Sequence, residues 1–148
     1  IQYKYITKYK KNCIMKITVK NSDLNKNSIE SINNIMDMDV SVSSAFKLMK
    51  VVKELTPLLE TKSELEKKIT EKHAQKDENG EYVLPLDEEG NKIEGTITIK
   101  NLEEFTKEMK DLMDINNELQ VDKINVEELG LKTVKTKDLI NLEFLFEM

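Results

Sequence analysis

His73 and Cys13 are the only histidine and the only cysteine of the chain, so they are the first candidates for chemistry. A hydrolytic triad or a zinc site would require His73 to gather partners, and the sequence gives no sign of them. His73 lies in a stretch rich in Lys and Glu, and we predict that it is an exposed helical residue. Cys13 lies in a basic segment near the start of the chain, so a Cys-His nucleophile pair is not indicated either. A single cysteine allows no intrachain disulfide, which fits a reducing compartment.

Two acidic, glycine-containing segments, residues 77–80 and 87–91, could in principle bind a phosphate or a metal ion. Neither has the glycine spacing and the Lys-Ser/Thr ending of a phosphate loop. The second also lacks the alternating acidic ligands and the closing Glu of a calcium loop, so both are predicted to be turns. The remaining carboxylates lie in hydrophilic stretches, where the burial that separates the pKa values of an acid and a base is not expected. We therefore predict a protein that is not an enzyme, with no catalytic residue, no metal site and no cofactor, whose ligand-binding residues the sequence does not identify.

The charged residues narrow the range of partners. The chain has 28 acidic residues against 23 basic ones, every basic residue is Lys, and the formal net charge is -5. Without Arg the chain lacks the planar fork that reads guanine edges and clamps phosphates, so sequence-specific nucleic-acid binding is not predicted. The longest apolar runs are far shorter than the roughly 20 residues of a membrane span, and no membrane segment or export signal is predicted.

Residues 1–14 contain four lysines and no acid, and they precede Met15 and the strand-like sequence MKITVK. We predict that Met15 is the natural start and that the basic leader is not native structure. The alternative is a basic arm for anionic surfaces. Residues 15–148 are short enough for one domain with a modest core, and we predict a single α+β domain.

The first elements follow from the spacing of apolar residues. Residues 15–20 alternate apolar and polar side chains, which predicts a half-buried strand. A short helix is expected over residues 24–36, capped by the polar residues 21–23. A much longer helix is predicted to begin at a Ser43 or Ser44 cap and to reach Ile69, because its apolar residues recur at alternating steps of three and four. Pro57 lies inside it and predicts a kink or a new helix start.

The second half of the chain is expected to fold back on this helix. Residues 82–84 and 96–99 are predicted to form a β-hairpin, with Pro85 at a strand end or edge. Asn101 begins a capping-box-like start of a helix that carries apolar residues to Met113 and can lie antiparallel to the long helix. Residues 131–135 are predicted to be a strand, and a last helix begins near Thr136.

These elements predict an α+β fold. Its main feature is a long antiparallel helical hairpin that carries the β-hairpin near its tip. Strands from the N- and C-terminal parts of the chain make a small sheet, and a short helix lies near the C-terminus. The C-terminal residues 142–146 are strongly apolar, so they must be docked somewhere.

Four segments carry a resemblance to a known family: MKITVK, EKHAQKDENGEYVLP, NLEEFTKEMKDLMD and LKTVKTKDLINLEFLFE. From Met15 onward the layout resembles a family of short uncharacterised proteins encoded by phages and prophages of low-GC Gram-positive bacteria. The resemblance implies a phage accessory protein in the cytoplasm of a bacterial host. It transfers no functional residue, because the likeness is one of composition and position.

Two functional hypotheses follow. The first is a binding protein that sequesters a host defence protein or a small anionic immune signal such as a cyclic nucleotide, using Lys, backbone donors and helix N-termini. The second is a morphogenesis or assembly factor that holds another phage protein through Phe144–Met148 or through Tyr82 and Val83. The apolar helix seams also suggest self-association. A deep pocket lined by Lys and an aromatic ring such as Tyr82 would favour a small ligand, and a flat apolar groove would favour a peptide.

Overall fold

The computed structural model describes residues 16–147, so the leader at 1–14, with Cys13, lies outside the described residues. The chain mixes helices and strands, which confirms the predicted α+β composition. Its helices are α2 (Lys26–Met36), α3 (Val42–His73), α4 (Leu102–Met113) and α5 (Thr136–Asn141), its 3₁₀ turns are η1 (Asn21–Asp23) and η2 (Val126–Leu129), and its strands are β1 (Lys16–Lys20), β2 (Asn116–Asp122), β3 (Ile124–Asn125) and β4 (Phe146–Glu147).

The chain divides into two compact units, each described by itself below. The first, which we call the core unit, contains the described residues up to Glu60 and those from Asp114 onward. The second, which we call the tip unit, is Thr61–Met113. The long helix α3 contributes its first part to the core unit and its last part to the tip unit.

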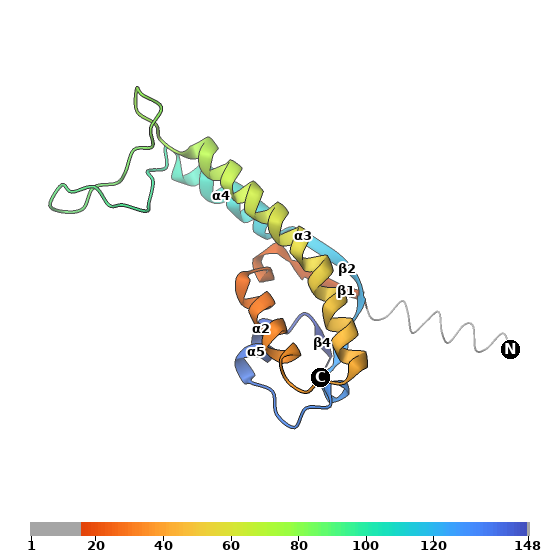
Figure 1. Cartoon of the computed structure of the whole chain (residues 1–148). Coiled ribbons are helices and arrows are strands. Elements are labelled where there is room, and N and C mark those ends of the chain that lie inside the picture. Colours follow the sequence, from red (N-terminus) through yellow and green to blue (C-terminus); the bar gives the residue numbers. More distant parts are fainter. Residues whose placement is uncertain (1–15, 148) are drawn as a thin grey trace, which may run out of the picture. The chain divides into compact units, whose positions relative to one another are not determined.

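A two-stranded antiparallel sheet joins distant parts of the core unit, and β1 and β2 lie side by side in Figure 1. Its register places Ile17 opposite Leu119, and a bulge between Lys16 and Ile17 brings Lys16 opposite Asp122. The alternation predicted for residues 15–20 is confirmed, since Ile17 and Val19 are buried and the three lysine and threonine positions of β1 are exposed. The free edge of β2 is partly protected by α3, because the N–H of Gln120 donates to Glu54 Oε1 at 3.0 Å.

The hydrophobic core of this unit lies between the sheet and the helices. Leu48, Val51 and Leu55 bring one face of α3 into it. The C-terminal segment is docked there as expected, with Leu142 and Leu145 fully buried. The core also includes Ile17, Val19, Leu24, Ile32, Ile35, Leu119, Val121, Ile124, Leu129 and Phe146.

Helices α2 and α5 pack against each other through polar contacts, and they lie next to each other in Figure 1. Asn141 Nδ2 donates to the buried Ser31 Oγ at 3.0 Å. The cap of α2 is Asn25, whose side chain accepts from the N–H of Ser28, so the predicted cap at residues 21–23 is wrong. Residues 21–23 instead form the tight turn η1, which leads the chain from the sheet into the helix.

Helix α3 begins two or three residues earlier than its sequence suggested. Ser41 Oγ accepts from the N–H of Ser44 at 3.2 Å, so Ser41, and not Ser43 or Ser44, is the N-cap. Ser44 is buried and its hydroxyl donates to the carbonyl of Glu128 at 2.9 Å. Pro57 does not start a new helix, because α3 is continuous from Val42 to His73.

The predicted strand at residues 131–135 is wrong. Instead β3 and β4 form a short parallel pair in which Ile124 lies opposite Phe146. Leu131 and Val134 pack against the core from an irregular segment between η2 and α5. A strand-like segment of five residues cannot become a strand without a neighbouring strand to pair with.

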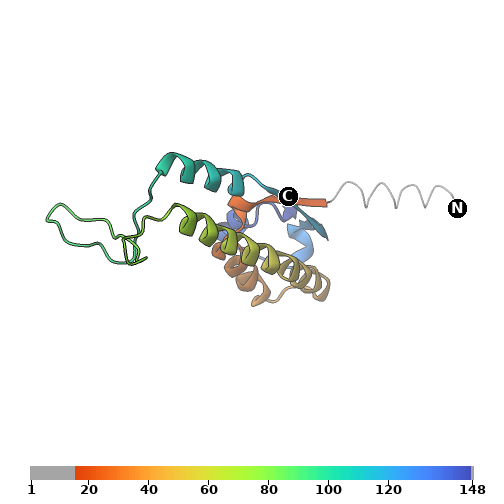
Figure 2. The ribbon, with the colours of Figure 1, turned by 90° about the horizontal axis from the view of Figure 1, so that it is seen from above.

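The connection between α3 and α4, residues 74–101, contains isolated bridges and no regular strands, so the predicted β-hairpin is not formed as a pair of strands. Ala74 bridges to Ile99, Lys76 to Tyr82, and Leu86 to Lys92. Figure 2 shows α4 running alongside the last turns of α3, with this connection beyond their ends. None of the helices in residues 16–147 is long and apolar enough to cross a membrane.

Candidate functional site: an open groove in the tip unit

The last turn of α3 is bound to α4 by two neighbouring side chains that share one carboxylate. Lys72 Nζ lies 2.6 Å from Glu108 Oε1, and His73 Nε2 lies 2.8 Å from Glu108 Oε2. His73 is 5% exposed and meets the edge of the Phe105 ring at a centroid distance of 6.1 Å. The prediction that His73 is exposed is therefore wrong. The sequence held a usable signal, because His73 continues the apolar positions Leu65 and Ile69 by a further step of four.

The two hydrogen-bond partners change the ionisation of Glu108. Hydrogen bonds from Lys72 and then from His73 hold the pKa of Glu108 below its usual value of 4.5. The same contact with Glu108 raises the pKa of Lys72 above 10.5. A lowered carboxyl pKa stabilises the folded state above the unfolded pKa, and this stabilisation is lost as the pH falls through the folded pKa. For Lys72 the stabilisation is present below 10.5 and is lost as the pH rises through the raised pKa.

Glu108→Gln is expected to lower the Tm of the tip unit most near neutral pH, because Gln keeps the shape of Glu108 but not its charge. The difference in Tm between wild type and variant should shrink as the pH falls below 4.5, where the wild-type carboxyl also becomes protonated. Thermal unfolding followed by circular dichroism from about pH 7 to about pH 3 would measure this. Glu64→Gln, an exposed position of α3, is the control. A difference in Tm that did not change with pH would contradict the assignment.

Two loops of the same construction lie in residues 74–101, at 77–81 and 87–91. In each loop the Oδ1 atom of the first residue, Asp77 or Asp87, accepts from the backbone N–H groups two and four residues later, at 2.8–3.0 Å. Gly80 and Gly90 have φ angles of 78° and 85°, which glycine adopts without strain. Both segments were predicted to be turns, and this is confirmed. The two Asp carboxylates close their own loops, while the Glu side chains of the loops point to solvent.

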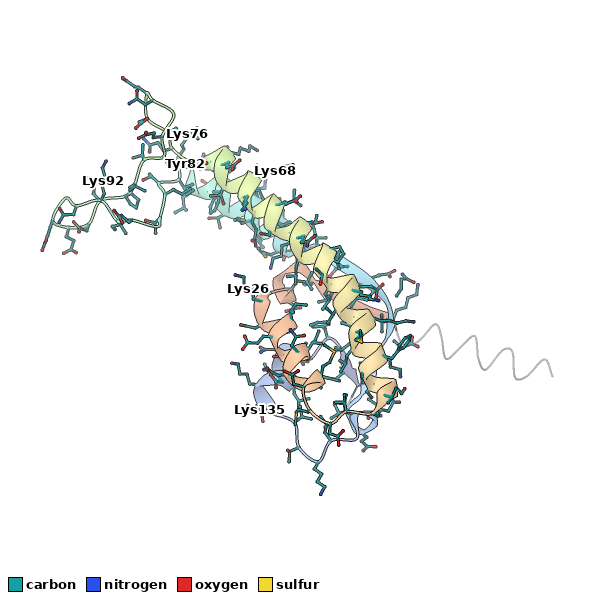
Figure 3. The ribbon with its side chains drawn as sticks, viewed as in Figure 1. Lys26, Lys68, Lys76, Tyr82, Lys92 and Lys135 are labelled. Carbon is teal, nitrogen blue, oxygen red and sulfur yellow. The ribbon has the colours of Figure 1, made fainter. Side chains whose placement is uncertain are left out.

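The loops are connected by a short stretch that pairs with both sides of the connection. The N–H of Val83 donates to the carbonyl of Gln75 at 2.9 Å, and the carbonyl of Val83 accepts from Thr98 at 2.9 Å. Tyr82, next to this ladder, has Lys76 Nζ 5.1 Å from its ring centroid. Figure 3 shows Lys76 and Tyr82 close together at the end of α3 and Lys92 on the second loop. The backbone pairing therefore fixes the position of Tyr82.

An open groove of about 680 Å³ lies among α3, α4 and this ladder. The apolar part of the groove is lined by Tyr82 and Ile97 from the connection and by Met109 from α4. Glu66, Lys67 and Glu71 of α3 give it a charged part, together with two hydroxyl side chains. The volume is that of a ligand site, but the groove is largely open to solvent, which suits a polypeptide partner better than an enclosed small molecule.

The tip unit has few buried side chains for its size. Within Thr61–Met113 the buried residues are His73, Ala74 and Leu112. Larger apolar side chains are exposed instead, namely Leu65, Tyr82, Leu86, Ile93 and Leu102. Of these, Tyr82 lines the groove, and an exposed aromatic ring in a groove is typical of a surface that a partner covers.

The remaining predicted contact residues are in other environments. Phe144–Met148 was predicted to offer a partner an apolar segment, and this is wrong for its described part, since Leu145 and Phe146 are buried in the core unit. That unit has smaller cavities of about 330 Å³, beside Asn141 and Phe144, and of about 220 Å³, beside Phe46 and Gln120. No group of His, Cys, Asp and Glu side chains within residues 16–147 is arranged to hold a metal ion.

No known protein family matches the chain, and no curated protein or solved structure is significantly similar to it.

Proposed function

We propose that the chain is a non-enzymatic binding protein that captures a polypeptide in the groove of the tip unit. The observation that supports this is the open groove itself, in which Tyr82, Ile97 and Met109 lie beside charged side chains of α3. Tyrosine and methionine are enriched at protein interfaces, because they combine a large apolar area with a polar or adaptable group. A groove with an apolar part beside a charged part matches a peptide that has one apolar side.

We infer that the last part of α3 and α4 act together as a helical hairpin with residues 74–101 at its tip. The contacts of Lys72 and His73 with Glu108 support this, since they join the end of α3 to the second turn of α4. The bridge between Ala74 and Ile99 closes the base of the connection. Such a hairpin would hold the groove at a fixed geometry while leaving its apolar side chains accessible.

Capture of a small anionic signal is the competing proposal, and the groove favours it less. Glu66 and Glu71 outnumber Lys67 along the groove, so a phosphate group would meet a net negative field. Lys76, whose Nζ lies 5.1 Å from the centroid of the Tyr82 ring, adds one further positive charge near the groove. A polypeptide tolerates both features, because it can pair its own charges with both signs.

The biological setting of this binding is proposed from the resemblance to phage proteins alone. A phage accessory protein with such a groove could sequester a host defence protein in the bacterial cytoplasm. The alternative is a morphogenesis factor that uses the same groove to hold a phage protein during assembly. Both proposals require a polypeptide at Tyr82, so one experiment tests their common step.

The experiment places the photo-crosslinker p-benzoylphenylalanine at Tyr82 and, in a matched variant, at Ile140, an exposed residue of the core unit. Irradiation in cells that produce the chain, followed by mass spectrometry, is expected to give a discrete crosslinked polypeptide from position 82 and not from position 140. Met109→Lys, which places a charge in the apolar part of the groove, should remove the same product.

A thermal-shift screen of the purified chain separates the two ligand classes. Cyclic mono- and dinucleotides and ADP-ribose derivatives are expected to leave the Tm unchanged. A saturable rise in Tm with one of them would show binding to the folded state and would overturn the polypeptide proposal in favour of anion capture. Equal crosslinking from positions 82 and 140 would also overturn it.

A further inference from the structure

A second exposed apolar surface lies on the first turns of α3, in the core unit. Val42, Phe46 and Met49 are 88%, 62% and 54% exposed. They are separated by steps of four and three, so they form one stripe along the outer face of the helix. The opposite face of the same turns carries the fully buried Leu48 and Val51. This stripe, which we call the α3 stripe, is therefore a surface separate from the groove.

The α3 stripe is bordered by positive charge. Lys50 Nζ lies 5.1 Å from the centroid of the Phe46 ring, and Lys53 continues the stripe by another step of four from Met49. In the part of the chain that the structure describes, neither Lys50 nor Lys53 has an acidic side chain within ion-pair distance. The cavity of about 220 Å³ opens beside Phe46, and its charged lining is Lys47, Lys50 and one acid, Asp122. The surface therefore suits a partner that carries acidic groups next to apolar side chains.

The chain itself contains a segment with this chemistry. Residues 76–94 of the connection have two lysines and seven acids, a formal charge of -5 that equals the net charge of the whole chain. Leu86 and Ile93, at the ends of the second loop, are 62% and 41% exposed. The carboxylate of Asp87 is used within the loop, but Glu88 and Glu89 are exposed and have no ion pair with any residue between 16 and 147.

We propose that the α3 stripe of one copy binds residues 86–93 of another copy, which are the second loop of the connection and the residues that flank it. Lys50 and Lys53 would pair with Glu88 and Glu89, and the apolar ends of the loop would cover Phe46. The contact joins two different surfaces, so it is a head-to-tail contact that leaves a free stripe on one copy and a free loop on the other. Assembly therefore grows with concentration and weakens as salt screens the ion pairs.

This inference goes beyond the proposed function, since it uses a different surface. The residues that line the groove, Tyr82, Ile97 and Met109, take no part in it. Crosslinking from position 82 and self-association can therefore succeed or fail independently.

The test uses two charge-reversal variants of the full chain. Lys50→Glu with Lys53→Glu disables the α3 stripe, and Glu88→Lys with Glu89→Lys disables the loop. Light scattering coupled to size-exclusion chromatography, from micromolar to near-millimolar protein, is expected to show the wild type assembling beyond a dimer. Each variant alone should bind itself at least about tenfold more weakly.

Mixing the variants gives the decisive result. The reversed stripe of one variant faces the reversed loop of the other, and the wild-type stripe and loop remain available on opposite members, so the mixture should assemble again. The control variant is Lys26→Glu with Lys135→Glu, at exposed positions on α2 and at the start of α5 that are labelled in Figure 3. It makes the same change in net charge as the stripe variant and should assemble like wild type. A wild type that stays monomeric, a control that dissociates as much as the stripe variant, or a mixture that stays monomeric would each overturn the proposal.

Discussion

Leu55→Ala is expected to lower the free energy of unfolding of the core unit by about 2.7–5 kcal/mol, the cost of removing a fully buried leucine and leaving a cavity. Leu55 is 0% exposed and lies on the face of α3 that packs against the rest of the core, next to Val51. The free energy is measured by chemical denaturation with linear extrapolation. Because a domain of this size has about 5–15 kcal/mol of total stability, the variant should lose a large fraction of it.

Met49→Ala is the matched control for this prediction. Met49 lies on the same helix, loses a side chain of similar volume, and is 54% exposed. Its free energy of unfolding should differ from wild type by no more than about 0.5 kcal/mol. A similar loss of stability in the two variants would contradict the burial described for α3.

The sequence predicted the buried face of α3 but not how completely each part is covered. The apolar spacing from Leu48 to Ile69 is regular, and Leu48 and Leu55 are fully buried as expected. Leu65 belongs to the same pattern, yet it is 37% exposed. Periodicity shows which side of a helix is apolar, whereas coverage depends on how many other elements pack there. The core unit supplies a sheet and two more helices, and the tip unit supplies only α4 and a connection without regular strands.

Two predictions from local sequence, the cap of α3 and the strand after Gly130, were wrong because contacts with distant residues determine the structure there. Ser44 was a reasonable cap by sequence, but Ser41 caps the helix, and the hydroxyls of both serines donate to the distant carbonyl of Glu128. The five-residue pattern after Gly130 resembled a strand, but the strand that pairs with β3 comes from Phe146–Glu147. Neither long-range contact can be inferred from the residues close in sequence.

The candidate site was partly predictable. The acidic glycine-containing segments were recognised as turns, since their Asp and Gly positions fit that geometry. Tyr82 was named as a contact residue, and it lines the groove. The sequence does not single out Glu66, Lys67 and Glu71, because a Lys/Glu pattern looks the same whether or not a groove runs beside it. His73 was missed because its charged neighbours were given more weight than its place four residues after Ile69 on the apolar face of the helix.

His73→Ala is expected to loosen the tip unit selectively. The variant removes a buried ring that contacts Glu108 at 2.8 Å and Phe105 edge-on, in a unit with few other buried side chains. A buried hydrogen bond to a charged group contributes about 1.5–3 kcal/mol, so amides of α4 and of the last turns of α3 should exchange about 10–100-fold faster. Hydrogen exchange followed by mass spectrometry would measure this. The amides of β1 and β2 in the core unit should keep their wild-type rates.

Lys72→Ala tests whether the buried ring of His73 or the positive charge next to Glu108 holds α4 against α3. Lys72 contacts the same carboxylate as His73, but its side chain is 65% exposed, and exposed ion pairs add little to stability. The variant should leave exchange in α4 close to wild type, although it removes a full positive charge next to Glu108. If the two variants accelerated exchange equally, charge at Glu108 rather than the buried ring would hold α4 against α3. If neither did, the apolar contacts of α4 alone would be sufficient, and the groove would not depend on this cluster.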